Sequence, residues 1–197
     1  MSVDWGERYR QGVTPWEKGQ AHPELAALLE THRDLVEAAD HILVPGCGFG
    51  HDARLIARHS EGTVIGLDIA PEAIEQARIL TEGPGPRWEV GDLFNWRGAY
   101  DLVFEHTCFC AIPVERRSDY VESMTRLIRP GGCLLGIFFL NPDHEGEDGP
   151  PFGVKREELD HFFGNSFEIR WSAAPRRTYP SRLGEGRELS LLLERRV

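Results

Sequence analysis

The chain has 197 residues, 41% of them hydrophobic, and its 22 Lys and Arg against 32 Asp and Glu give a formal net charge of −10 at pH 7. This length predicts a single domain over residues 1–197, because domains cluster at about 100–200 residues. The negative charge argues against nucleic acids and anionic membranes as partners, because both are bound through clustered Lys and Arg.

The longest nearly apolar stretch has nine residues, from Gly132 to Leu140, whereas a membrane-spanning helix needs about 20. The first ten residues, MSVDWGERYR, are polar and charged, unlike a signal peptide. The sequence therefore predicts no membrane span and a cytoplasmic location.

Apolar runs and turn residues alternate along the chain in a pattern typical of α/β proteins. Strands are predicted at residues 41–44, 63–67, 87–90, 100–105, 133–140, 167–172 and 188–194, and helices at 52–59, 71–80, 114–128 and 157–163. Strands that alternate with helices favour a parallel sheet with helices on both faces. The last two strands have no clear helix between them, which favours an antiparallel pairing at the sheet edge. The predicted fold is a seven-stranded, mostly parallel sheet with an antiparallel last strand.

A glycine loop, VPGCGFGHDA, lies between the first predicted strand and helix, with Gly46, Gly48 and Gly50 at alternate positions. Such a loop lets a ligand approach the backbone, and the helix that follows offers free N–H groups and a positive dipole end. Asp68 ends the next strand, twenty residues after Gly48, where an acid can accept hydrogen bonds from ribose hydroxyls. The alternative is a tight turn with a capping acid, but glycines and acid together favour a nucleotide-like ligand.

The glycine spacing narrows the choice of ligand. His51 occupies the last position of the GxGxxG dinucleotide fingerprint, which argues against a nicotinamide oxidoreductase, and no Lys is placed for a P-loop. The pattern GxGxG resembles motif I of class I S-adenosylmethionine-dependent methyltransferases. In that fold an acid after the third strand contacts adenine, and VGDLF supplies Asp92 and Leu93 there. Asp92 as a simple turn aspartate is the alternative.

Further segments make the resemblance specific: WGERYRQGVTPWEKGQAHP from Trp5 to Pro23, GLDI, FEHTCFCAIPVERRSDY and GPPF. Together they resemble the thiopurine S-methyltransferase family, and more closely its plant-type halide and thiol methyltransferase branch, from about Trp5 to Val154. The resemblance implies a Rossmann-like class I fold and S-adenosylmethionine as cofactor, with S-adenosylhomocysteine as product. It implies methyl transfer to a small soft nucleophile, with a thiol as the leading candidate for the acceptor. Alternatives are a halide, a thiopurine, a selenium or tellurium oxyanion, or a non-catalytic cofactor-binding protein.

The resemblance also implies which residues bind the cofactor. The segment of residues 1–22 would cover the cofactor with three aromatic side chains, although the plant branch has Trp where this chain has Tyr9. Ring faces attract a sulfonium cation when water is excluded; the alternative is that these rings anchor a helix on the core. The implied cofactor residues are Trp5, Tyr9, Trp16, Gly46, Gly48, Asp68, Ile69, Asp92, Leu93 and His106.

His106 matches a position beside cofactor and acceptor that holds Tyr in the plant branch and Arg in the thiopurine enzymes. It is the candidate catalytic residue, as proton acceptor for a weakly acidic thiol, because imidazoles titrate near neutral pH. A thiolate or halide needs no base, so the alternative is that His106 only lines the pocket. No metal is expected, because Cys108 and Cys110 lack the CxxC spacing. A small-molecule acceptor is the expected partner, with no obligate protein partner.

Overall fold

The computed structural model of the protein describes residues 3–140, 149–184 and 186–197. The chain forms two compact units, over residues 1–96 and 97–197. The single domain over residues 1–197 and the cofactor-covering segment at residues 1–22 stay predictions.

The first unit is built on three parallel strands in the order β3-β2-β1: β1 (His41–Pro45), β2 (Thr63–Asp68) and β3 (Arg87–Val90). Parallel neighbouring strands need a crossover connection. The helix α4 (His51–Ala57) connects β1 to β2, and α5 (Pro71–Ile79) connects β2 to β3. Small and branched side chains of these helices are buried, so helices and strands share one apolar core. Its members include Ile42, Leu43, Val64, Leu67, Ala53, Ile56, Ala73 and Ile74.

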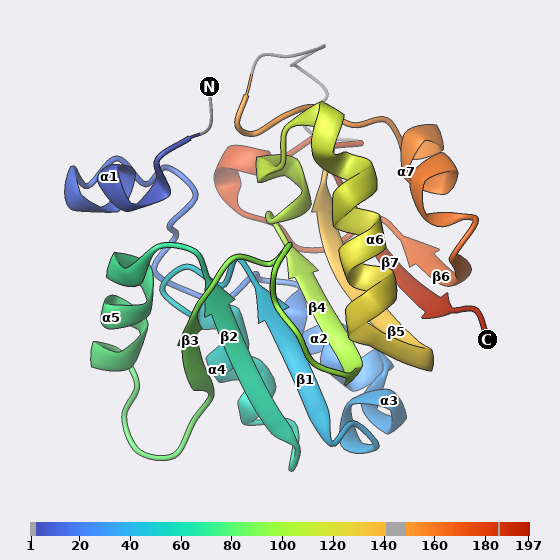
Figure 1. Ribbon diagram of the computed structural model, residues 1–197, viewed down its shortest axis with the longest axis horizontal. Helices are drawn as coiled ribbons and strands as arrows, with labels where there is room; N and C mark the ends of the chain where they lie inside the picture. The colour runs from blue at the N-terminus through green and yellow to red at the C-terminus, as the bar shows by residue number, and fades with distance from the viewer. Residues whose placement is uncertain (1–2, 141–148, 185) are drawn as a thin grey trace. The chain divides into compact units, whose positions relative to one another are not determined.

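Three short helices precede this sheet: α1 (Trp5–Arg10), α2 (Leu25–Thr31) and α3 (Arg33–Glu37). The helix α1 lies beside α5 (Figure 1). No element was predicted from the sequence over residues 25–37, where α2 and α3 lie. Their helical spacing is nevertheless visible in the buried residues Leu25, Leu28, Leu29 and Val36.

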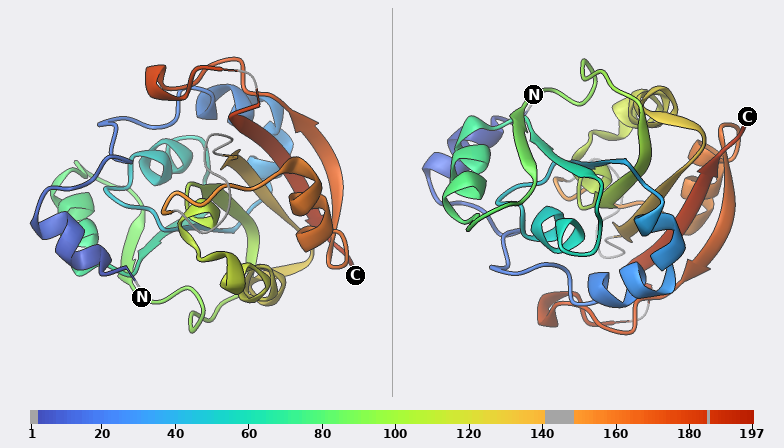
Figure 2. Two further views of the ribbon diagram at one scale, coloured as in Figure 1. Left: turned by 90° about the horizontal axis from the view of Figure 1, so that it is seen from above. Right: turned by 90° about the horizontal axis from the view of Figure 1, so that it is seen from below.

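The second unit holds four strands in the order β4-β5-β7-β6. β4 (Tyr100–His106) and β5 (Ile128–Phe139) are parallel, whereas β7 (Glu188–Arg195) pairs antiparallel with both β5 and β6 (Phe167–Ala173). Figure 2 shows the β6–β7 pair at the edge of this unit. Seven strands, mostly parallel and with an antiparallel last strand, confirm the predicted fold class. The other elements in the described part of this unit are α6 (Arg117–Leu127), α7 (Arg156–Phe163) and the 3-10 turns η1 (Phe109–Ala111), η2 (Val114–Arg116) and η3 (Pro180–Arg182).

The strand β5 begins at Ile128, five residues before the predicted start at residue 133, although the intervening PGG sequence at residues 130–132 is typical of a turn. The helix does end at Leu127, but Ile128 already pairs with Tyr100, and the register shifts before Leu102 pairs with Cys133. Gly132 sits in this irregularity, where an added Cβ would lie 2.9 Å from the carbonyl oxygen of Asp101. Strand pairing therefore continues through a sequence whose local signal is a turn.

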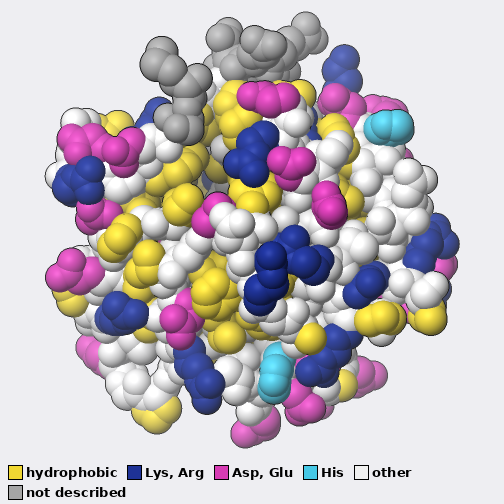
Figure 3. Space-filling model, in the orientation of Figure 1, with side chains coloured by type: hydrophobic (Ala, Val, Ile, Leu, Met, Phe, Trp, Pro, Cys, Tyr) yellow, Lys and Arg dark blue, Asp and Glu magenta, His cyan; other side chains and the backbone are white. Residues whose placement is uncertain are grey.

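Charged side chains of both signs share the face of the molecule drawn in Figure 3. Within the described residues, no helix combines the length and apolar character needed to cross a bilayer.

Candidate functional site

The loop after β1 depends on glycine at three alternate positions. Gly46, Gly48 and Gly50 have φ values of 59°, 54° and 76°, in the left-handed region that other residues adopt at a cost. Gly50 is the N-cap of α4. The backbone N–H of Cys47 donates to the carbonyl oxygen of Leu67, 3.0 Å away, which ties the loop to the end of β2.

Asp68, the last residue of β2, binds this loop through its side chain. Its Oδ2 accepts from the N–H of Gly48 and its Oδ1 from the N–H of Ala70, both at 2.9 Å. Burial raises the pKa of Asp68, and these two backbone donors offset part of the rise. A carboxylate has about four acceptor positions, and the N–H of Ile69 also contributes to this one, so capacity for a further donor remains. Ile69, the next residue, is 52% exposed, which sets an accessible apolar side chain directly after the buried acid.

Four rings form an aromatic cluster next to the loop: Trp5, Tyr9, Trp16 and Phe49. Ring centroids lie 5.3 Å apart for Trp5 and Trp16, 5.7 Å for Tyr9 and Trp16, and 5.4 Å for Tyr9 and Phe49. The indole N–H of Trp16 donates to the hydroxyl of Tyr9 at 3.1 Å, and burial raises the pKa of that hydroxyl. An added Cβ on Gly48 would lie 3.2 Å from the same hydroxyl oxygen. The N-terminal aromatic residues therefore lie against the glycine loop, and their contact with the cofactor stays a prediction.

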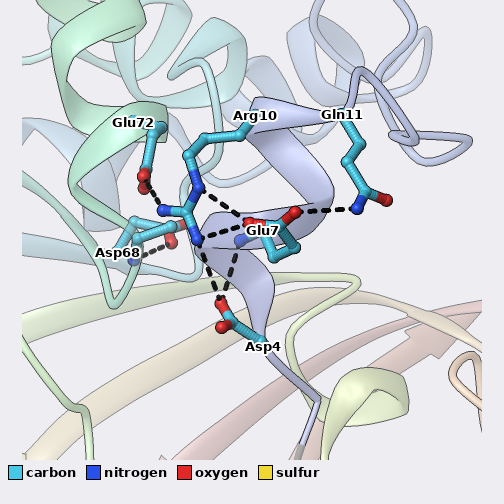
Figure 4. Close-up of polar contacts among 7 residues, drawn as sticks. Asp4, Glu7, Arg10, Gln11, Asp68 and Glu72 are labelled. Atoms are coloured by element: carbon cyan, nitrogen blue, oxygen red, sulfur yellow. Dashed lines mark hydrogen bonds and ion pairs between the residues drawn. The ribbon is translucent and has the colours of Figure 1, made fainter.

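Polar contacts hold the N-terminal segment to the rest of the first unit. Arg10 of α1 forms ion pairs with Glu7 on its own helix and with Glu72 in the first turn of α5 (Figure 4). Further along, the Nε2 atom of His51 lies 3.0 Å from Oε1 of Glu17. Burial raises the pKa of Glu17, but the hydrogen bonds from His51 and the N–H of Gly19 more than offset this and lower it overall. The segment is thus fastened at both α4 and α5.

The turn after β3 contains Asp92 and Leu93. Oδ1 of Asp92 accepts from the N–H of Phe94 at 3.0 Å, and Oδ2 accepts from the side-chain amide of Asn95 at 2.9 Å. These are the contacts of a turn aspartate, and an adenine contact would come in addition to them. The N–H of Gly91 donates to the carbonyl oxygen of Asp68 at 2.9 Å, which brings this turn next to the end of β2.

His106 ends β4 in the second unit and is followed by a strained residue. Thr107 has a φ of 62°, which is uncommon outside glycine. The fully buried Glu105 holds this loop, since its carboxylate accepts from the N–H of Phe109 at 2.9 Å and from the hydroxyl of Tyr120. Burial raises the pKa of Glu105. The backbone on both sides of His106 is therefore fixed by buried contacts.

Two residues around His106 were missed by the sequence analysis. The Nη1 atom of Arg182 lies 3.2 Å from Nε2 of His106 and 2.8 Å from Oε1 of Glu188. Both Arg182 and Glu188 are buried. They belong to the C-terminal part of the chain, where no motif was recognised, and buried charges of this kind carry no local sequence signal.

The predicted residues of the first unit therefore come together around the end of β2: the glycine loop, Asp68 with Ile69, the N-terminal rings and the turn at Asp92. His106 belongs to the second unit, with Arg182 and Glu188.

The arrangement of strands and helices is shared with solved structures. The N-methyltransferase NodS from Bradyrhizobium japonicum, solved in complex with S-adenosyl-L-homocysteine, superposes with a TM-score of 0.70 at 14% identity, over 97% of each chain. Likeness at this identity shows the fold, which is that of the class I S-adenosylmethionine-dependent methyltransferases.

Sequence comparison assigns the family. The chain matches the thiopurine S-methyltransferase family over residues 2–185 and belongs to it. It is 37% identical to thiocyanate methyltransferase 1 of Brassica oleracea over 76% of this chain and 66% of that protein. The identity to thiocyanate methyltransferase 1 of Arabidopsis thaliana is 33%, over 94% of this chain and 85% of that protein. These matches confirm the recognised family, and the chain is an S-adenosylmethionine-dependent methyltransferase.

The residues of the first unit fit this cofactor chemically. Asp68 retains acceptor capacity for ribose hydroxyls, and the exposed side chain of Ile69 offers apolar surface beside it. The left-handed glycines hold the loop open where a side chain on Gly48 would meet Tyr9. The electron-rich faces of the aromatic cluster suit a positively charged sulfur.

Proposed function

We propose that this methyltransferase acts on a small soft nucleophile, a thiol first, in the cytoplasm, and that it binds its cofactor in the first unit. The observation that carries the proposal is the joint contact of Asp68 and Tyr9 with Gly48, one through a hydrogen bond and one through close approach. The names of the plant relatives support a small sulfur-containing acceptor.

When bound, S-adenosylmethionine supplies a methyl group on a positively charged sulfur. In the proposal Asp68 binds the ribose hydroxyls, with Ile69 against the sugar and base, and Gly46 and Gly48 let the backbone approach the cofactor. The carboxylate keeps its two backbone donors in this role, so binding requires no rearrangement of the loop.

The remaining cofactor contacts come from either side of this centre. Leu93 packs on the adenine and Asp92 accepts from its amino group, while Trp5, Tyr9 and Trp16 exclude water from the sulfonium side. Water exclusion favours the reaction of an anionic nucleophile, because it removes the hydration that stabilises the anion before transfer.

His106 is proposed to line the acceptor side of the site. Its neighbours Glu105 and Thr107 fix the backbone at the end of β4, where ligands bind in open α/β folds. An acceptor held in line with the methyl group gains much of the rate from alignment alone. In the proposal, a fixed orientation of the His106 ring therefore matters more for the reaction than a strong base at this position.

The test is product detection with methyl-labelled S-adenosylmethionine over a panel of acceptors: an alkyl thiol, an aromatic thiol, thiocyanate, iodide, a thiopurine and selenite or tellurite. We expect labelled methyl thioethers from the thiols, and calorimetric binding of S-adenosylhomocysteine but not of NAD. Labelled product from the oxyanions or the thiopurine alone would replace the thiol as acceptor. A protein that binds the cofactor but labels nothing in the panel would favour the non-catalytic alternative.

A further inference from the structure

The Nε2 atom of His106 is already engaged by a buried guanidinium. Nη1 of Arg182 lies 3.2 Å from it, and a guanidinium has N–H donors only and stays protonated in proteins. Nε2 must therefore be the acceptor of this hydrogen bond. A neutral His106 that accepts at Nε2 carries its proton on Nδ1.

Arg182 is held in place from several sides, so the hydrogen bond to His106 is built into the fold. Its Nη1 also donates to Oε1 of Glu188 at 2.8 Å, and the other Glu188 oxygen accepts from the hydroxyl of Thr178. Its guanidinium carbon lies 4.6 Å from the ring centroid of Phe139 and 5.4 Å from that of Tyr179. The side chain of Arg182 is only 9% exposed.

The orientation of the His106 ring is fixed as well. The ring stacks on Tyr179, with centroids 6.2 Å apart and planes inclined by 20°. The charged or titratable groups facing it within the second unit are Arg182 from η3, Tyr179 just before η3, Glu188 from β7 and Glu105 from its own strand. A proton added at Nε2 would point an N–H group at the N–H group of Arg182 and lose the hydrogen bond.

We propose that Arg182 is a positioning residue that keeps Nε2 of His106 as a hydrogen-bond acceptor, and that the enzyme in consequence takes acceptors already ionised in solution. This rests on the proposed function, in which His106 lines the acceptor side. A neutral thiol must lose its proton before or during methyl transfer, and with Nε2 occupied that proton goes to water. Thiolates of acidic thiols and halide-like anions have no proton to lose.

The first test reads the tautomer directly and needs no activity. In protein labelled with ¹⁵N-histidine at pH 7.5, we expect the His106 signals to show a protonated Nδ1 and an unprotonated Nε2, with the assignment taken from a His106→Asn variant. A protonated Nε2 overturns the proposal. Because this readout does not involve transfer, it stands or falls separately from the proposed methylation.

The second test compares acceptors in Arg182→Met and Arg182→Lys. For the wild type we expect kcat/KM with an alkyl thiol to rise about tenfold per pH unit from pH 6.5 to 8, following the thiolate fraction. Iodide, which has no proton, should give a nearly flat profile. Arg182→Met frees Nε2 to act as a base, so the thiol profile should become flatter than that of the wild type, and the thiol-to-iodide ratio at pH 7 should rise at least about tenfold.

Arg182→Lys keeps a cationic donor and should keep the wild-type profile. If Arg182→Met lowers kcat/KM equally for the alkyl thiol and for iodide and leaves the shapes of both pH profiles unchanged, Arg182 is only structural and the proposal is wrong. A wild-type thiol profile that is already level above pH 7 would show a working base and contradict it too. If Arg182→Met does not fold, the tautomer of His106 and the pH profile of the wild type still test the proposal.

Discussion

The two units hold their functional residues by different means. In the first unit, backbone does most of the positioning: Asp68 binds the N–H groups of Gly48 and Ala70, and three left-handed glycines set the path of the loop. In the second unit, His106 is held by side chains, and its hydrogen-bond partner Arg182 lies 76 residues further along the chain.

This difference indicates how each unit can vary. A loop fixed by glycines and a strand-end acid tolerates little change, because each replacement alters the backbone itself. A ring held by Arg182, Glu188 and Tyr179 can change partners while strand β4 remains. Under the proposed function, the cofactor side is therefore the part that tolerates least change, and the acceptor side is the part that can change specificity.

The largest expected effect is on the cofactor side, from Asp68→Ala. Loss of hydrogen bonds to a charged group costs about 1.5–3 kcal/mol, so affinity for S-adenosylhomocysteine should fall about 10- to 100-fold by calorimetry. Because the change also removes the acceptors for Gly48 and Ala70, thermal unfolding without ligand is measured beside it. The affinity of Asp68→Asn, which retains one acceptor oxygen, should lie between those of the wild type and Asp68→Ala. A folded Asp68→Ala protein with undiminished affinity would exclude the ribose role.

On the acceptor side, Glu105 should make stability depend on pH. Burial raises its pKa in the folded state, so its contribution is fully present below the unfolded pKa of about 4.3 and is lost as the pH rises through the folded pKa. Glu105→Gln does not titrate and keeps an acceptor for Phe109 and a donor for Tyr120. The free energy of unfolding of Glu105→Gln should therefore increase relative to that of the wild type as the pH rises above about 4.5, by up to about 1.4 kcal/mol per pH unit.

Urea unfolding at several pH values measures this difference, and the exposed Glu122→Gln on α6 controls for the loss of one charge. The raised pKa of Asp68 acts in the same direction but is common to both proteins and cancels in the comparison. A difference between Glu105→Gln and wild type that stays constant with pH would mean that Glu105 is not held as described.

A pair of glycine variants separates backbone strain from ligand binding in the first unit. Gly48 and Gly83 both have positive φ, 54° and 71°, but an added Cβ meets the hydroxyl of Tyr9 only at Gly48 and has no neighbour within 4 Å at Gly83. Both Gly→Ala changes should cost about 1–2 kcal/mol of stability. Only Gly48→Ala should also weaken S-adenosylhomocysteine binding and alter Tyr9 fluorescence. Equal binding losses in the two variants would indicate a general effect of strain.

The sequence allowed the strands and the loop after β1 in the first unit to be predicted closely, because their signals are local, whereas α2 and α3 were missed. Gly46, Gly48 and Asp68 stand at strand ends, where spacing along the chain translates directly into distance in space. Asp92 shows the limit, since its turn contacts with Phe94 and Asn95 were the alternative interpretation and its adenine contact stays a prediction.

In the second unit the fold was predicted but not the surroundings of His106. Arg182 and Glu188 lie in and after a segment without regular periodicity, and their pairing depends on how that segment folds back. The early start of β5 was missed for a related reason, because pairing of Ile128 with Tyr100 overrides the local turn signal of PGG. Long-range pairing of this kind cannot be inferred from one sequence.

The smallest expected effect concerns how α1 is held against α5. The ion pair of Arg10 with Glu72 is exposed on the Arg10 side and adds little on its own, whereas the rings of the aromatic cluster are partly buried. Arg10→Gln should therefore raise amide exchange over residues 4–20 by no more than about fivefold, less at high salt. Tyr9→Ala removes a ring that contacts both Trp16 and Phe49 and should have the larger effect. Arg33→Gln, which breaks a similar exposed ion pair with Glu30 away from α1, is the matched control.

Bound S-adenosylhomocysteine should protect the amides of residues 4–20 in the wild type and much less in Tyr9→Ala, because the rings gain their last contacts only from the ligand. If protection is unchanged by ligand in both proteins, the N-terminal rings serve only to anchor a helix, and the cofactor site is confined to the loop and the strand ends.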